Sequence, residues 1–298
     1  GVVLVAKGLQ IVQDVQQHRG LSSGVLNGNQ SMREKHGAKG REIDEKLKGL
    51  TAELPQKLLD GEIWSAIAAE WNSLRTGSLN LSAAESFSRH TQLVDRLLFF
   101  LVEIADQTGL AFDADVDAFY LADSALNRLP AVSERLGQLR ALGVGYLAKK
   151  EIGEAQKVQL NNLIAEMRVP LRFLNVNLGK TMRYNPGVAG IGEARDRINQ
   201  ETEEVIRLIG TDIVAATFST APSDYFARMT QLIDLGYKET YDTLLPALKS
   251  LLETRAEHAR RQLLLVLGYA VAILAVIGYV SVGAYFSTID NVKALAAG

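Results

Sequence analysis

The stretch that decides the class of this protein runs from Gln262 to Ser287 and reads QLLLVLGYAVAILAVIGYVSVGAYFS, without one charged residue. A helix needs about 20 apolar residues to cross a bilayer core about 30 Å thick, and residues 263–286 meet that length. Tyr285 and Phe286 stand near one end, where aromatic side chains favour the membrane interface. The stretch predicts a transmembrane helix over 263–286. The alternative is a long buried helix of a soluble protein.

The flanks of this span give conflicting signals. Three basic residues precede it, at Arg255, Arg260 and Arg261, whereas Lys293 alone follows it. Basic residues gather on the cytoplasmic side, so this bias alone would place residues 8–261 inside the cell. Large domains are translocated largely regardless of charge, however, and the orientation therefore stays open on charge alone. Residues 1–7 begin with the apolar GVVLVA and are expected to be the end of an earlier membrane helix; the alternative is the frayed start of a soluble helix.

Composition excludes several classes of function. The 298 residues carry a formal net charge of -2 and no cysteine. A near-neutral chain lacks the basic footprint of a nucleic-acid binder, and the absence of cysteine rules out disulfides and thiolate-ligated metals. The acidic run Asp113-x-Asp115-x-Asp117 resembles a calcium loop, but Ala118 and Ser124 stand where such a loop needs Gly and Glu. We expect no metal, no cofactor and no enzymatic activity.

Helical periodicity runs through residues 8–261, and strand-like alternation is hard to find. The expected helices cover 8–52, 56–76, 81–108, 115–148, 151–184, 190–220 and 223–261. The first would be about 68 Å long and the second about 30 Å. Such lengths predict an all-α, elongated antiparallel bundle of two four-helix modules stacked end to end with shared long helices, plus one transmembrane helix.

Two features of this prediction remain open. Seven segments cannot return the chain to the same membrane, so one boundary must be wrong or one connection must run along the bundle. The weak spot is 211–220 (TDIVAATFST), which could be extended. Pro130, Pro170 and Pro246 lie inside helical patterns, where each removes a backbone hydrogen bond and either kinks the helix or frees a carbonyl for a polar site.

The most informative local motif is QQHRGLSSG, residues 16–24. Gln16, Arg19 and Ser23 fall at i, i+3 and i+7, hence on one helix face. Glycine recurs every four residues, at Gly20, Gly24 and Gly28. Glycine inside a helix costs about 1 kcal/mol relative to alanine, so this strip needs a packing or binding reason. A guanidinium beside amides and hydroxyls suits a small planar anion, whereas the alternative is an arginine on a glycine-rich packing face.

These residues carry a family resemblance. The pattern Gln16-x-x-Arg19-Gly20-x-Ser22 resembles the first-helix motif of the nitrate- and nitrite-sensing domains of bacterial receptors, although the family usually has Glu where this chain has His18. A longer stretch also resembles periplasmic sensor regions of methyl-accepting chemotaxis proteins and related receptors. It reads Tyr120-Leu121-x-Asp123…Asn127-Arg128-Leu129-Pro130…Glu134-x-Leu136-Gly137-x-x-Arg140-x-x-Gly143.

The resemblance implies how the chain is divided. Residues 1–7 end a first membrane helix, residues 8–261 form an extracytoplasmic sensor domain, and residues 263–286 cross the bacterial inner membrane. The tail from Tyr285 resembles the start of a HAMP linker, expected over 287–298. This organisation implies a periplasmic domain, against the visible charge bias, a homodimer, and a cytoplasmic signalling module in a further C-terminal part.

The resemblance also implies a function and a site. The chain is expected to be a chemoreceptor or related signal-transduction receptor that senses a small ligand, with nitrate or another small anion as the candidate. In the family an arginine of the first helix and one of a late helix bind the anion. The expected ligand-binding residues are Gln16, Arg19, Ser22 and Ser23, with Arg207 and Arg228 as candidates for the second arginine. The alternatives are the sensor region of a histidine kinase or diguanylate cyclase, or a membrane-anchored scaffold bundle without a ligand.

Overall fold

The computed structural model describes residues 1–110, 115–188 and 190–297, and within these ranges it contains helices and no strand. The predicted all-α class is therefore confirmed. The chain divides into two compact units, residues 1–249 (unit 1) and residues 250–298 (unit 2). Of the acidic run that resembles a calcium loop, Asp113 lies outside the described residues.

The first half of unit 1 is an antiparallel four-helix bundle, here called the first bundle. Its helices are α1 (Val2–Leu26), α2 (Arg33–Thr51), α4 (Glu62–Gly77) and α5 (Ala83–Gln107), with the short α3 (Gln56–Leu59) between α2 and α4. Helix α1 contacts both α2 and α5, and α4 contacts α5. The indole of Trp71 donates to Asp44 across 2.9 Å, joining α4 to α2 and closing the ring of four helices.

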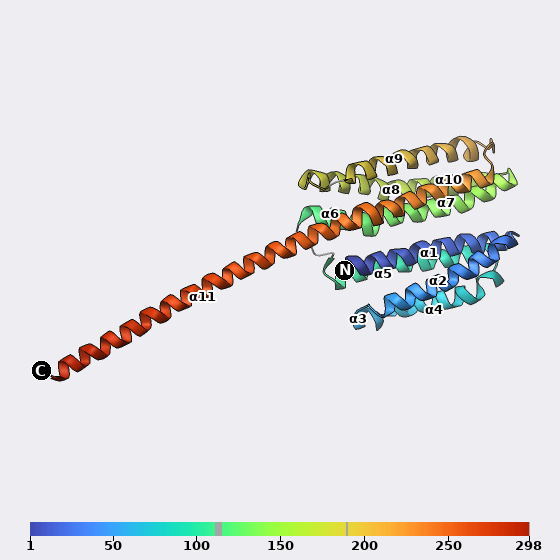
Figure 1. Cartoon of the computed structure of the whole chain (residues 1–298). Helices are drawn as coiled ribbons and strands as arrows, with labels where there is room; N and C mark the ends of the chain where they lie inside the picture. The colour runs from blue at the N-terminus through green and yellow to red at the C-terminus, as the bar shows by residue number, and fades with distance from the viewer. Residues whose placement is uncertain (111–114, 189, 298) are drawn as a thin grey trace. The chain divides into compact units, whose positions relative to one another are not determined.

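The second half of unit 1 repeats this architecture as the second bundle. Its helices are α7 (Leu129–Lys149), α8 (Glu154–Tyr184), α9 (Ile191–Leu208) and α10 (Pro222–Glu239), preceded by the short α6 (Val116–Asp123). Each helix contacts the next, and α10 contacts α7 again, so this ring is also closed (Figure 1).

The predicted helix 8–52 is wrong, because α1 and α2 are two antiparallel helices. The chain reverses at Asn27–Asn29, where Gly28 takes a φ of +100°, a backbone conformation that side chains with a Cβ adopt only under strain. The Asn27 amide donates to the Ser23 carbonyl across 2.8 Å and helps to end α1. This extra reversal supplies the eighth antiparallel segment that the predicted seven lacked.

The suspected weak spot at 211–220 is not extended. Helix α9 continues through a π-helical turn, η5 (Ile209–Val214), and the chain then turns into α10. Asp212 accepts hydrogen bonds from the backbone N–H and hydroxyl of Ser219 and from the backbone N–H of Thr220, at 2.6–2.9 Å. These bonds organise a turn in which Ala216 and Phe218 have positive φ.

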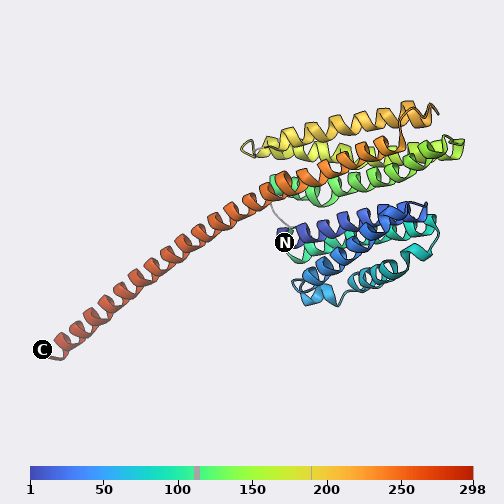
Figure 2. The same cartoon turned by 45° about the vertical axis from the view of Figure 1, so that its right-hand side comes forward.

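The two bundles of unit 1 lie side by side rather than end to end, each with its own four helices (Figures 1 and 2). They contact each other through α1 and α7, and through α5 and the π-helical turn η4 (Ser124–Arg128). The predicted end-to-end stacking with shared long helices is therefore wrong, because it followed from the single long helix 8–52.

The predicted apolar stripes do form the bundle cores. Leu93, Leu97, Phe100 and Ile104 on α5 are all at most 2 % exposed. On α8 the stripe is buried at Leu160, Met167, Leu171 and Leu174, whereas Leu163 is half-buried. Each such side chain contributes roughly 1.5–3 kcal/mol through burial, which explains why the helices associate.

Two of the three internal prolines coincide with π-helical turns. Turn η4 comes directly before α7, whose second residue is Pro130, and turn η6 (Thr240–Leu244) comes directly before α11, whose second residue is Pro246. Proline makes no hydrogen bond to the carbonyl four residues back and its ring clashes with that carbonyl, and a wider preceding turn relieves this clash. Pro170 instead lies within the regular helix α8. Helix α10 therefore passes through η6 into α11 (Leu245–Ala297) with a local change of pitch.

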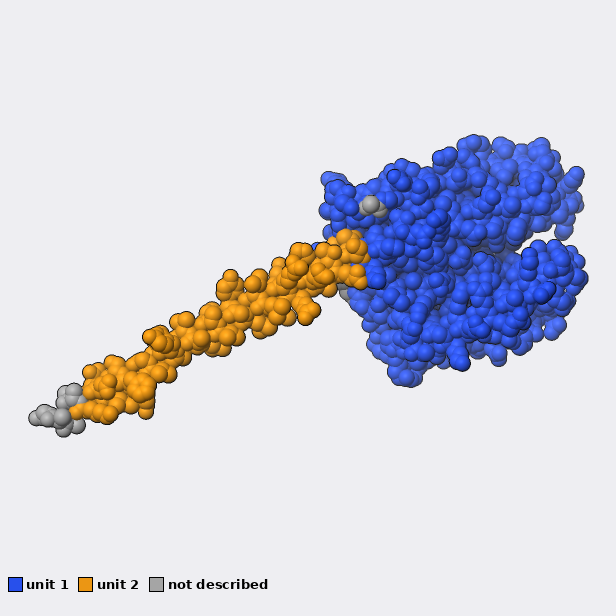
Figure 3. Space-filling view, viewed as in Figure 1, with its two compact units in different colours: residues 1–249 blue, residues 250–298 orange. Residues whose placement is uncertain are grey.

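Unit 2 consists of the helix α11 from residue 250 onward (Figure 3, orange). Its large apolar side chains between Leu263 and Phe286 are exposed. The helix is long and apolar enough to cross a membrane, with a mean hydropathy of 2.6 over its most apolar window. The span predicted over 263–286 lies within this helix.

Candidate functional site

The motif on α1 lies at the boundary between the two bundles. Gln16 and Arg19 are one helical turn apart and are 4 % and 2 % exposed. A guanidinium is almost never buried without a partner, because losing its hydration is costly. The surroundings of Arg19 therefore decide what this motif does.

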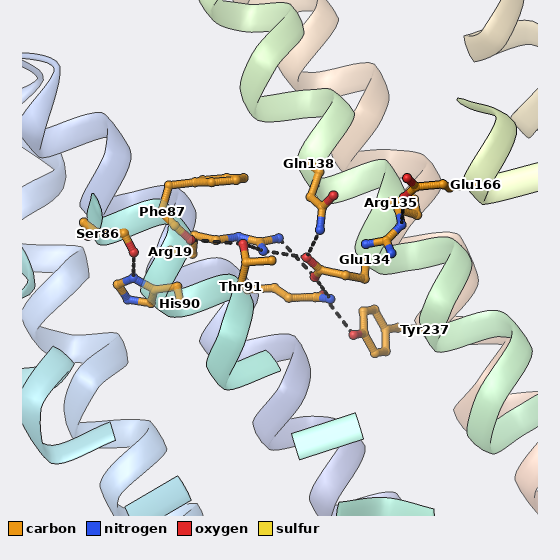
Figure 4. Close-up of polar contacts among 11 residues, drawn as sticks. Arg19, Ser86, Phe87, His90, Thr91, Glu134, Arg135, Gln138, Glu166 and Tyr237 are labelled. Atoms are coloured by element: carbon orange, nitrogen blue, oxygen red, sulfur yellow. Dashed lines mark hydrogen bonds and ion pairs between the residues drawn. The ribbon is translucent and has the colours of Figure 1, made fainter. Parts of the chain in front are cut away.

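Arg19 is paired with Glu134 of α7 in a forked arrangement (Figure 4). Its Nη1 donates to Oε1 of Glu134 across 2.6 Å, and its Nη2 donates to Oε2 across 3.1 Å. Nη1 also donates to the hydroxyl of Thr91 across 2.7 Å, and the guanidinium lies 4.8 Å from the ring centre of Phe87. Because both charges are 2 % exposed, this ion pair joins α1 to α7 in surroundings that screen it poorly.

Further donors converge on Glu134. The side-chain amide of Gln16 donates to its Oε2, and that of Gln138 donates to its Oε1, both across 2.8 Å. Tyr237 of α10 donates its hydroxyl to the Oε1 of Gln16 across 2.9 Å. Burial raises the pKa of Tyr237 well above its usual value, so its hydroxyl keeps its proton. The buried network therefore links α1, α7 and α10.

Two glycines face two arginines that point in opposite directions across this boundary, and one of them, Gly137, is required by the close approach. A Cβ on Gly137 of α7 would lie 2.9 Å from Nη2 of Arg19, which is too close for an ordinary contact. A Cβ on Gly20 of α1 would lie 3.7 Å from Nη2 of Arg140. The 3.7 Å distance at Gly20 is an ordinary contact, so the structural reason for the glycine strip lies elsewhere: a Cβ on Gly24 would lie 2.3 Å from Sδ of Met32, and Gly28 has a φ of +100°.

A cavity of about 240 Å³ lies beside this network, between α1, α7 and α10. Arg140 lines it and donates to the hydroxyl of Thr230 across 2.7 Å, with its guanidinium 4.9 Å from the ring centre of Phe226. The remaining lining residues are Gln13, Gln16, Gln17, Gly20, Leu21, Met32, Gly137, Ile233 and Asp234. Amides and one buried guanidinium therefore face a space large enough for a small molecule.

The charges around the cavity partly offset one another. Burial, and secondly the charge of Arg19, lower the pKa of Arg140 to about 10, so its guanidinium remains charged at neutral pH. Burial raises the pKa of Asp234, while the charge of Arg140 opposes this shift. The cavity thus has one buried cation, Arg140, and one exposed carboxyl group, Asp234.

The structure brings two of the predicted site residues together and places the others elsewhere. Gln16 and Arg19 share the buried network. Ser22 is fully buried inside the first bundle, 3.0 Å from Nε2 of His36, and Ser23 is half-buried one residue further on. Neither serine lines the cavity.

The two candidates for a second arginine lie on the surface of the second bundle. Arg207 is exposed on α9. Arg228 on α10 is half-buried and pairs with Glu201 and Glu204 of α9, at 2.5 Å and 2.6 Å. Neither lines the cavity, whose basic side chain is Arg140.

Sequence reasoning missed Glu134 and Arg140. Both stand in the stretch Glu134-x-Leu136-Gly137-x-x-Arg140 that carries the receptor resemblance, but no role could be assigned to them there. The usable signal was Gly137, which lies between the two charged residues on a helix and marks a close approach by a neighbour. Gly143, six residues after Gly137, has the same meaning, because a Cβ there would lie 2.4 Å from the ring of Tyr225.

A second polar cluster, of His18, His36 and His90, is buried in the first bundle. Nδ1 of His90 donates to the carbonyl of Ser86 across 2.6 Å, so its Nε2 accepts from Nδ1 of His18 across 2.9 Å. The Nε2 of His18 is then an unprotonated nitrogen without a partner. Among the described residues no group of three or more histidines and carboxylates is placed to hold a metal ion.

Burial sets the charge state of this cluster. Burial, with smaller contributions from neighbouring charged and histidine side chains, lowers the pKa of His18 to about 2. Burial is also the main reason why the pKa of His90 falls to about 4 and that of His36 falls below its usual value. The histidines are therefore neutral packing groups at neutral pH.

Comparison with known proteins identifies the domain. The chain folds as a helical unit with a buried guanidinium beside a small cavity. The model of the nitrate and nitrite sensing family matches residues 10–248, well over half of the chain, and the chain belongs to this family. The resemblance seen in the first-helix motif is thereby confirmed. No curated protein and no solved structure matches the chain significantly.

Proposed function

We propose that the chain is a membrane receptor that binds nitrate, nitrite or a similar small oxyanion in the cavity between α1, α7 and α10. The observation that carries this proposal is Arg140, a buried and charged guanidinium that faces the cavity. Its partners there are the hydroxyl of Thr230 and the ring of Phe226, neither of which neutralises its charge.

The chemistry of the cavity suits a planar oxyanion. A guanidinium donates paired hydrogen bonds to two oxygens of one planar group, and the glutamine amides on α1 supply further donors to a third oxygen. In poorly hydrated surroundings such bonds are stronger than in water. Asp234 opposes a second negative charge, which favours a small monovalent anion over a multiply charged one.

The site is connected to the segment that leaves the domain. Gln16 lines the cavity and accepts from Tyr237, which stands three residues before the π-helical turn η6. Helix α11 follows η6 directly and contains the apolar span. A ligand that binds two packings of the bundles unequally shifts their populations, and the shift passes along this continuous helix.

The membrane arrangement is part of the same proposal. Residues 263–286 cross the bacterial inner membrane, residues 8–261 are periplasmic, and residues 287–298 begin a HAMP-like linker toward a cytoplasmic signalling module. A homodimer supplies the partner against which a single span can move. A chemotaxis receptor is the output we favour, with a histidine kinase or diguanylate cyclase as the alternatives.

A thermal-shift titration of the chain in lipid nanodiscs tests the ligand. Nitrate, nitrite, formate and chloride are compared on the wild type, on Arg140→Met and on the surface control Arg228→Met. Ligand at 100 times its dissociation constant contributes about 2.7 kcal/mol, which raises the melting temperature by roughly 5 °C or more.

We expect this rise with nitrate or nitrite in the wild type and in Arg228→Met, and its loss in Arg140→Met. If none of the anions shifts the wild type, the proposal fails and the scaffold alternative is favoured. If Arg228→Met loses the rise and Arg140→Met keeps it, the cavity is not the binding site.

A further inference from the structure

The first-helix arginine, Arg19, already holds an anion that belongs to the protein itself. Glu134 presents two carboxylate oxygens to the two terminal nitrogens of Arg19, at 2.6 Å and 3.1 Å. Nitrate would present two oxygens of a planar group to the same fork. The site of Arg19 that suits the sensed anion is thus occupied by a side chain of comparable shape.

This ion pair does not line the cavity but lies directly behind two residues that do, Gly137 and Gln16. Gly137 lines the cavity, and its missing Cβ would lie 2.9 Å from Nη2 of Arg19. Gln16 also lines the cavity while donating to Oε2 of Glu134. An anion beside Arg140 would therefore be separated from the guanidinium of Arg19 only by Gly137 and the side-chain amide of Gln16.

The charges do not permit an anion to join the pair without change. The two cations Arg19 and Arg140 are matched by the two carboxylates Glu134 and Asp234. Asp95 of α5 is a third carboxyl group nearby: burial raises its pKa, and the charge of Glu134 raises it further. A further negative charge on Arg19 would stand beside a buried carboxylate with no additional cation. Contact with Arg19 therefore requires Glu134 to leave the fork.

We propose that Glu134 is a tethered competitor of the ligand, which holds Arg19 in the empty receptor and is displaced when the oxyanion binds. This inference rests on the proposed function and adds its regulation. Exchange of one anion for another leaves Arg19 paired but breaks the connection between α1 and α7. Gln16, which donates to Glu134 and accepts from Tyr237, is then released toward α10.

The test compares two carboxylate-to-amide variants in nanodiscs. Glu134→Gln keeps the shape but removes the competing charge. Glu166→Gln is the matched control, because Glu166 forms a half-exposed ion pair with Arg135, which follows Glu134 in sequence (Figure 4). Nitrate dissociation constants are measured by calorimetry, with chloride as the spherical comparison ion.

We expect Glu134→Gln to bind nitrate at least tenfold more tightly than the wild type, and Glu166→Gln to agree with the wild type within twofold. If the wild type binds nitrate and Glu134→Gln binds it equally or more weakly, Glu134 does not compete with the ligand, while the proposed function stands. If neither protein binds any of the anions, the proposed function itself fails.

A second measurement needs no variant of the network. Side-chain nitrogen resonances of arginine are followed while nitrate is added to the wild type, with Arg19→Lys and Arg140→Lys used for assignment. If nitrate displaces Glu134 from Arg19, the Arg19 signal shifts together with that of Arg140. A shift of Arg140 alone would show that Glu134 stays in place, and would overturn the inference.

Discussion

The two bundles of unit 1 share one architecture but bury their polar groups in different ways. The first bundle encloses three neutral histidines: His18 hydrogen-bonds to His90, His90 also bonds to the Ser86 carbonyl, and His36 bonds to the Ser22 hydroxyl. The second bundle contributes charged Glu134 and Arg140 to the boundary, and its helices contain the π-helical turns η4, η5 and η6.

This difference suggests a division of labour. Neutral, mutually bonded side chains between regular helices favour one packing. Charged groups beside a cavity permit more than one packing of the helices, and so do π-helical turns close to prolines. We infer that the first bundle is the fixed partner and the second bundle is the part that responds to the ligand.

The largest effect is expected from breaking the bridge between the bundles. Arg19→Met leaves Glu134 buried without its cation, and removal of one member of a buried pair costs about 3–5 kcal/mol. Denaturant unfolding of this variant beside the wild type measures the loss. Arg19→Met with Glu134→Met should recover most of the stability, because no charge remains unpaired. A loss below about 1 kcal/mol in the single variant would mean that the bridge is not structural.

Acid is expected to destabilise the first bundle next most strongly. A histidine whose folded pKa is lowered contributes no penalty above its unfolded pKa, near 6.5, and stability falls as the pH drops below that value. For His90, with a folded pKa of about 4, the loss between pH 7 and pH 4 is roughly 3 kcal/mol. Unfolding curves at pH 7, 5.5 and 4 test this, and His90→Asn should flatten the dependence. Equal slopes in the two proteins would contradict it.

The turn between α9 and α10 tests the second bundle alone. Burial by itself raises the pKa of Asp212, but hydrogen bonds from Ser219 and Thr220 outweigh it and hold the pKa at about 2. Asp212→Ala leaves those donors without their acceptor and should cost about 1–3 kcal/mol. Ser223→Ala in the same connection is the control. A melting temperature equal to that of the wild type would show that the hydrogen bonds of Asp212 do not stabilise the turn.

The smallest effect is expected at Arg228. Its ion pairs with Glu201 and Glu204 are partly exposed, and pairs of this kind contribute about 0–1 kcal/mol. Arg228→Met should therefore shift stability by less than about 1 kcal/mol, measured by denaturant unfolding. A loss of several kcal/mol would mean that α9 and α10 depend on this surface pair, and the second bundle would then be less adjustable than inferred.

Much of the fold was readable from the sequence, because helical periodicity and the apolar span are local signals. Periodicity does not predict the reversal at Asn27-Gly28-Asn29, although Asn-Gly is a turn signal, because the helical patterns on both sides are strong. That error removed one helix and produced the wrong end-to-end stacking.

The site was only half readable for a different reason. Gln16 and Arg19 lie on one turn of one helix, so their proximity follows from helix geometry. Glu134 stands 115 residues away from Arg19, and only tertiary packing brings them together. The cavity face of α10 carries Phe226, Thr230 and Ile233 at i, i+4 and i+7, and Arg228 does not belong to that face. Distance along the chain does not show which arginine lies at the cavity. The position of each residue around its helix, and the glycines beside Arg140, are the signals that do.

Hydrogen–deuterium exchange of the nanodisc-bound chain, with and without nitrate, tests the central claim most directly. We expect faster exchange at residues 237–244, where release of Gln16 frees Tyr237 and the turn η6, and unchanged exchange at residues 86–104 of the first bundle. Equal changes in both segments, or changes confined to 86–104 while nitrate is bound, would contradict the division between a fixed and a responding bundle.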